Sequence, residues 1–166
     1  MRKIQLKQKP PYWLSLGCGE REENEFLKDK FAPPPLHKEF IGLDERDMGQ
    51  EIVWKILNGI PLPDESVKFI WASHIMEHFD NTEIMEVMEE CWRVLQHKGL
   101  LEIRCPADTS TVSNMPFHKS FIHWNYFDIF FNGSRLDRYG YHSWELVERE
   151  KYHTERGDDF KFILKK

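Results

Sequence analysis

The sequence has no apolar run that approaches the roughly 18 residues of a membrane-spanning helix, so we expect no membrane partner. Its opening segment, MRKIQLKQKPPYWL, also lacks an apolar stretch of signal-peptide length. The basic residues of this segment predict a flexible, solvated arm over residues 1–10. The length predicts a single domain over residues 1–166.

Cysteine is scarce, and positive charge is not in excess. The three cysteines form no C-x-x-C pair, which excludes a zinc site built from paired thiolates. Their number favours a reducing, cytoplasmic compartment over a disulfide scaffold. The formal net charge of -5 argues against broad electrostatic binding of nucleic acid, so nucleic acid is the partner that we expect least.

Apolar segments of strand length recur along the chain. They predict β-strands over residues 12–16, 39–44, 51–56, 66–73 and 100–106. The segment at 66–73 is apolar over most of its length, as a strand covered on both faces would be. Residues 143–166 predict a closing hairpin with its turn at Gly157-Asp158.

Helical periodicity lies between these segments. Residues 81–98 form the clearest predicted helix, with Asp80 or Asn81 as its cap and Gly99 as its stop. Residues 19–31 and 123–131 predict shorter helices. The order of elements predicts an α/β fold: a Rossmann-like, mostly parallel sheet with helices on both faces and a C-terminal antiparallel β-hairpin.

Two features follow the first two predicted strands, at the edge where ligands of parallel sheets bind. The glycines of Gly17-Cys18-Gly19 allow the backbone to approach a ligand closely. Asp44 stands where an acid accepts hydrogen bonds from ribose hydroxyls. No G-K-[ST] follows, and the third glycine of a dinucleotide fingerprint is missing. The pair predicts an adenosine-like ligand, although each feature alone also fits a packing turn or a cap.

The stretch WASHIMEHFD contains His74-x-x-Glu77-His78, the H-x-x-E-H spacing of a zinc peptidase site. Such a site needs both histidines on one face of one helix. A β-rich segment leads directly into His74, and Asp80 starts a new helix, so we expect no metal here. Glu77 and His78 are expected to form a local hydrogen-bonded corner, and a zinc hydrolase is the remote alternative.

Several motifs in order give the sequence a specific resemblance. They are WLSLGCGE, FIGLD, NGIPLPDESVKFIWASHIMEHF and MEECWRVLQHKGLLEIRCP, within about residues 12–106, and further on FHKSFIHWNYFDIFF. Together they resemble the class I S-adenosylmethionine-dependent methyltransferases, in a branch with a short methyltransferase domain. The resemblance implies an enzyme that uses S-adenosylmethionine as cofactor, and it says little about the methyl acceptor.

The resemblance also implies roles for individual residues. Gly17, Cys18 and Gly19 would pass under the methionine and ribose portions of the cofactor. Asp44 would bind the ribose hydroxyls, with Glu45 beside it. Lys55 and Ile56 would face the adenine, and Ser73 and His74 would border the transferable methyl group.

Three positions depart from the pattern of the family: Ser15 and Lys55 stand where acids or amides are common, and Lys68 replaces a frequent Asp. Lys55 matters most, because a cation cannot accept a hydrogen bond from the adenine amino group. These departures keep a non-catalytic binding module on the same fold as the alternative to an active enzyme.

A general base is needed only if the acceptor must lose a proton. His118, on the segment before the aromatic helix, is the first candidate, His74 the second and Asp108 the third. Each also fits a structural role. The acceptor is expected to be a small molecule, a glycan precursor or a protein side chain. The short lid segment leaves room for a second chain to complete the pocket, so a homo-oligomer is one option.

Overall fold

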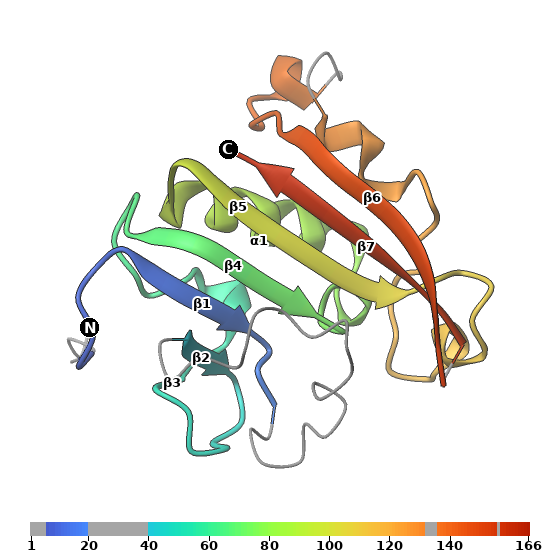
Figure 1. Cartoon of the computed structure of the whole chain (residues 1–166), viewed down its shortest axis with the longest axis horizontal. Helices are drawn as coiled ribbons and strands as arrows, with labels where there is room; N and C mark the ends of the chain where they lie inside the picture. Colours follow the sequence, from blue (N-terminus) through green and yellow to red (C-terminus); the bar gives the residue numbers. More distant parts are fainter. Residues whose placement is uncertain (1–5, 20–39, 132–135, 156) are drawn as a thin grey trace.

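The computed structural model describes residues 6–19, 40–131, 136–155 and 157–166. Seven strands form one sheet in the order β3-β2-β1-β4-β5-β7-β6 (Figure 1). The strands are β1 (Tyr12–Leu16), β2 (Phe40–Asp44), β3 (Ile52–Val53), β4 (Val67–Ser73), β5 (Leu95–Pro106), β6 (Glu145–Thr154) and β7 (Gly157–Lys165). The pairs among β1 to β5 are parallel, and β7 runs antiparallel to β5 and β6. The predicted mostly parallel sheet with a terminal antiparallel hairpin is therefore confirmed.

The helix α1 (Asn81–Val94) connects β4 to β5 and lies behind the sheet in Figure 1. Asp80 caps it, because its carboxylate accepts hydrogen bonds from the Thr82 and Glu83 amides. Its buried face carries Ile84, Val87, Met88, Cys91 and Val94. The helix is shorter than predicted, since the chain enters β5 at Leu95 and Gly99 lies within that strand.

Short 3₁₀ turns make up the remaining helical structure of the described residues. They are η2 (Ile56–Asn58), η3 (Met76–His78), η4 (Thr111–Asn114), η5 (Tyr126–Phe130) and η6 (Leu136–Tyr139). The strand predicted at 51–56 is wrong beyond Val53, because the indole of Trp54 bonds to the Gly59 carbonyl and the chain turns into η2. The helix predicted at 123–131 is only the turn η5.

The two faces of the sheet differ in what covers them. Ile70, Leu101 and Phe162 are fully buried in one core with α1, and Phe127 of η5 packs on Phe162 from the same side. The alternate residues of the strands face the opposite side. Residues 20–31 of the helix predicted at 19–31 lie outside the described residues, as do residues 1–5 of the predicted arm.

None of the described helices has the length and apolarity required to cross a bilayer. The three cysteines are not joined by disulfides. Burial raises the pKa of Cys91 and Cys105 well above the usual range, so both thiols stay neutral and pack as small apolar groups.

Candidate functional site

The glycine turn leaves β1 at the edge of the sheet to which β1, β4 and β5 all point in Figure 1. Gly17 and Gly19 have φ angles of +61° and +54°, in the left-handed region that favours glycine. A Cβ atom on Gly17 would lie 2.7 Å from Ile75 Cδ1, whereas a Cβ atom on Gly19 would meet no atom of the described residues within 4 Å. The turn is thus closed on the Gly17 side and open on the Gly19 side.

Asp44 is the last residue of β2 and lies against this turn. Its Oδ2 accepts a hydrogen bond of 3.1 Å from the Gly19 amide, and its Oδ1 accepts one of 3.0 Å from the Arg46 amide. The side chain is 9% exposed. A carboxylate offers about four acceptor positions, so the two amide bonds from the described residues leave capacity for two ligand hydroxyls, with the Arg46 Nε 3.6 Å from Oδ1. The structure therefore brings the Asp44 carboxylate into contact with Gly19.

The segment after β3 also reaches this edge. Lys55 is exposed and extended, and Ile56 is 7% exposed and joins the core at the start of η2. Glu45 is exposed next to Asp44. Of these three side chains, Ile56 is the one fixed by packing.

His74 directly follows β4 and has a φ angle of +53°, which is uncommon for a residue with a side chain. Its amide donates to the Arg104 carbonyl at 2.8 Å and extends the pairing of β4 with β5. Its Nδ1 lies 3.4 Å from Glu77 Oε1, and its Nε2 lies 3.3 Å from Asp159 Oδ2. The imidazole is therefore fixed between two carboxylates.

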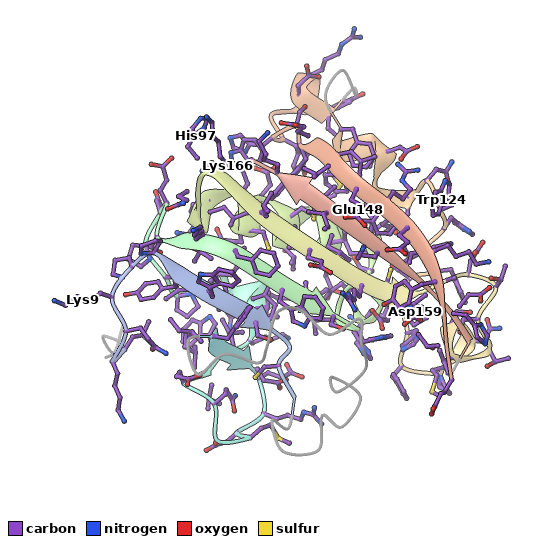
Figure 2. The ribbon with its side chains drawn as sticks, viewed as in Figure 1. Lys9, His97, Trp124, Glu148, Asp159 and Lys166 are labelled. Carbon is purple, nitrogen blue, oxygen red and sulfur yellow. The ribbon has the colours of Figure 1, made fainter. Side chains whose placement is uncertain are left out.

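These carboxylates are buried, with side-chain exposures of 3% for Glu77 and 5% for Asp159. Partial burial by itself lowers the pKa of His74, but hydrogen bonds and charge attraction from Asp159 and Glu77 outweigh it and raise the pKa to about 9. Sequence analysis missed Asp159, which Figure 2 labels near the end of β5. The predicted antiparallel hairpin could have indicated Asp159. A last strand that runs antiparallel to the others begins at the edge where the parallel strands end, so its first residues lie at the ligand-binding edge.

The H-x-x-E-H stretch does not form one helix. His74 precedes the turn η3, which contains Glu77 and His78, and α1 begins only at Asn81. The structure instead brings His118 to this turn: ligand atoms of Glu77, His78 and His118 lie within 4.8 Å of one another. His74 contacts Glu77 Oε1, and Ser73 ends β4 partly buried.

The segment between β5 and β6 carries the remaining candidates. Asp108 Oδ2 lies 2.8 Å from His123 Nδ1 near the surface. Phe127 and Phe130 are buried in the core, whereas Phe117, Phe121 and Trp124 are 58%, 48% and 44% exposed. The aromatic segment is therefore divided between core packing and a surface beside the turn that holds His118.

Comparisons with known proteins agree with this architecture. Residues 14–103 match the family model described as a methyltransferase domain. No functionally curated protein matches the sequence significantly. An S-adenosylmethionine-dependent methyltransferase from Archaeoglobus fulgidus superposes with a TM-score of 0.61 at 19% identity, over 93% of this chain and 86% of that chain.

Two further solved structures have the same fold. The N-methyltransferase NodS from Bradyrhizobium japonicum WM9, in complex with S-adenosyl-l-homocysteine, gives a TM-score of 0.54 at 12% identity, over 93% of this chain and 76% of that chain. The [4+2]-cyclase SpnF gives a TM-score of 0.63 at 12% identity, over 98% of this chain and 77% of that chain. At these identities the likeness shows the shared fold.

Proposed function

Because the chain belongs to the methyltransferase-domain family, we propose that it is an active methyltransferase that transfers a methyl group from S-adenosylmethionine to a small-molecule, glycan or protein acceptor. One observation carries the proposal: the Asp44 carboxylate is hydrogen-bonded to the Gly19 amide at the carboxyl edge of a parallel sheet. This edge is where ligands of such sheets bind.

The residues at this edge fit the cofactor. Asp44 keeps acceptor capacity for two ribose hydroxyls, and the open space beside Gly19 allows the methionine and ribose portions to lie against bare backbone. Cys18 would continue this backbone surface, and Glu45 would lie beside Asp44. Lys55 would present backbone groups and Ile56 an apolar contact to the adenine.

Bound S-adenosylmethionine supplies an electrophilic methyl group on a sulfonium sulfur. The chain supplies alignment and exclusion of water. Ser73 ends β4 and His74 follows it at this edge, so both are proposed to border the methyl group, with His74 held in one orientation by Glu77 and Asp159. His118 and His74 are the proposed proton acceptors for an acceptor group that must lose a proton.

A second candidate is a non-catalytic module on the same fold. It is favoured by the exposed Lys55 cation at the position after β3, where the adenine amino group needs an acceptor. The [4+2]-cyclase SpnF shares the fold and its name describes a different chemistry, so the fold by itself does not require methyl transfer. Binding of cofactor without transfer to any acceptor would support the second candidate over the first.

Calorimetry with S-adenosylmethionine and S-adenosylhomocysteine tests the cofactor site. Asp44→Asn should lower both affinities by about 10- to 100-fold, since a hydrogen bond to a charged group contributes about 1.5–3 kcal/mol. Asp137→Asn, an exposed carboxylate on η6, is the matched control and should bind like the wild type. Wild-type protein that binds neither compound would overturn the proposal.

Methyl transfer is then tested with a tritium-labelled methyl donor and separated small-molecule, glycan and protein fractions of a cell extract. Label should enter one fraction with wild-type protein and not with Asp44→Asn. No transfer in any fraction, together with normal cofactor binding, would favour the non-catalytic module.

A further inference from the structure

The turn η3 and the segment Met115–Ser120 are joined by hydrogen bonds. The Glu77 carbonyl accepts from the amides of Lys119 and Ser120, at 2.8 Å and 3.2 Å. The Ser120 hydroxyl donates to the Phe79 carbonyl at 2.7 Å. These bonds tie together two segments about forty residues apart, and they hold His118 beside η3.

The result is a cluster of two imidazoles and one carboxylate. Glu77, His78 and His118 each offer a ligand atom within 4.8 Å of the others. The rings of His78 and His118 meet edge to face, with centroids 5.0 Å apart. Two His nitrogens and one Glu oxygen are a donor set that binds Zn²⁺ with three protein ligands and one open position. Ligands of a tetrahedral zinc ion lie about 3.4 Å apart, so small side-chain rotations would close the cluster.

The ring proton of His118 lies on the nitrogen that suits a metal ligand. Its Nδ1 lies 3.2 Å from the Ser113 carbonyl, which can only accept a hydrogen bond, so Nδ1 carries the proton. This leaves the lone pair on Nε2 for a ligand. Metal-binding histidines commonly donate their second ring N–H to a backbone carbonyl in the same way.

Glu77 provides an independent observation. Its side chain is 3% exposed, and Oε1 faces His74. Oε2 has no hydrogen-bond partner within the described ranges of the chain. A buried carboxylate oxygen without a partner is costly, and a cation bound at the cluster would supply that partner.

We propose that Glu77, His78 and His118 form a site for a divalent cation of the zinc class. His78 and His118 are only partly buried, so the site can be reached from solvent. The fourth position would hold water or an oxygen or nitrogen atom of a ligand. This site replaces the His74, Glu77 and His78 set suggested by sequence spacing, because the fold brings in His118 while His74 pairs with Asp159. With metal bound, Nε2 of His118 is a ligand and not a proton acceptor.

The test uses the full chain without an affinity tag, stripped with a chelator and kept free of S-adenosylmethionine. Calorimetry with Zn²⁺ and visible absorption with Co²⁺ should show one equivalent bound, with cobalt bands of a tetrahedral site. His78→Asn and His118→Asn should each weaken Zn²⁺ binding by more than the roughly 100-fold loss that follows removal of an outer-shell partner.

His97→Ala is the matched control, because His97 is exposed and lies at the other end of the sheet from Asp159 in Figure 2. It should bind like the wild type. Circular dichroism establishes that each variant is folded. Folded wild-type protein that binds no Zn²⁺, or Zn²⁺ binding unchanged in both His78→Asn and His118→Asn, would overturn the proposal. Because neither measurement requires cofactor or methyl transfer, failure of the proposed methyltransferase activity would leave the result unaffected.

Discussion

Gly19 and Asp44 are joined by a hydrogen bond of 3.1 Å from the Gly19 amide to Asp44 Oδ2. The bond links the turn after β1 to the end of β2. The Gly17 amide adds a second link, because it donates to the Leu43 carbonyl at 2.8 Å. Hydrogen bonds within the protein therefore fix the proposed cofactor surface before any ligand binds.

The two glycines of this turn should respond differently to substitution by alanine. Gly17→Ala places a Cβ atom 2.7 Å from Ile75 Cδ1 at a φ of +61°, so the free energy of unfolding should fall by about 3 kcal/mol. In Gly19→Ala only the left-handed backbone conformation is unfavourable, so the free energy of unfolding should fall by about 1–2 kcal/mol. Its new methyl group would occupy the open space proposed for the cofactor, so it should weaken S-adenosylmethionine binding.

Urea unfolding and calorimetry on both variants check this prediction. Equal losses of stability would mean that Ile75 moves aside. Unchanged cofactor affinity in Gly19→Ala would mean that the cofactor does not lie against this turn.

Asp159 should act as a positioning residue for His74. Asp159→Asn removes the charge that faces His74 Nε2 at 3.3 Å, while Asp44 and the glycine turn stay intact. Misplacement of a group next to the reacting atoms mainly affects the chemical step. We expect kcat for methyl transfer to fall by about 10-fold or more, with cofactor affinity nearly unchanged.

Steady-state kinetics measures kcat for methyl transfer, and calorimetry measures the cofactor affinity. Asp158→Asn is the neighbouring control, because Asp158 pairs with Lys151 and His153 at the surface of the hairpin. A purely structural role for Asp159 would lower stability and both kinetic quantities together.

The carboxyl edge of the sheet could be predicted from the sequence because local signals mark it. Apolar runs predict β1, β2 and β4; the glycines follow β1 directly, and Asp44 ends β2. The end of α1 could not be predicted locally, because Leu95–Gly99 are drawn into β5 by distant partners. The Lys98 amide donates to the Lys166 carbonyl, and the Lys166 amide donates to the Gly99 carbonyl. Asp159 and His118 reach their partners through the same kind of long-range contact, so spacing in the sequence could not reveal them.

In the aromatic segment after β5, the loss of stability on substitution by alanine should depend on how deeply each side chain is buried. Phe127 is fully buried against Phe162, so Phe127→Ala should cost about 3–5 kcal/mol of stability. Phe121 is 48% exposed, so Phe121→Ala should change stability by no more than about 0.5 kcal/mol. If the exposed aromatics contact the methyl acceptor, Phe121→Ala should raise KM for that acceptor. Thermal unfolding and acceptor titrations measure both effects, and a large loss of stability in Phe121→Ala would contradict the assignment.

Arg93 holds the loop between β3 and β4 against α1. Its guanidinium donates to the carbonyls of Ile60 and Leu62, and it pairs with Glu90 on its own helix and with Asp64 of the loop. This gives a physical reason for the E-x-x-R spacing of Glu90 and Arg93. Arg93→Met leaves these acceptors without their donor, so stability should fall by about 2 kcal/mol after allowance for partial exposure. Arg138→Met, at an exposed position of η6, is the control.

The effect of Arg93→Met should also depend on pH. The hydrogen bond from Arg93 lowers the pKa of Glu90; burial opposes this, and the Ile60 amide adds to it. A carboxyl group with a lowered pKa in the folded state contributes stability that is fully present above its unfolded pKa, about 4.3, and is lost as the pH falls through the folded value. The stability difference between wild type and Arg93→Met should therefore be constant near neutral pH and shrink in acid. Urea unfolding between about pH 7 and pH 3.5 measures it, and a difference that stays constant down to the acid end would contradict a contribution from the Arg93–Glu90 pair.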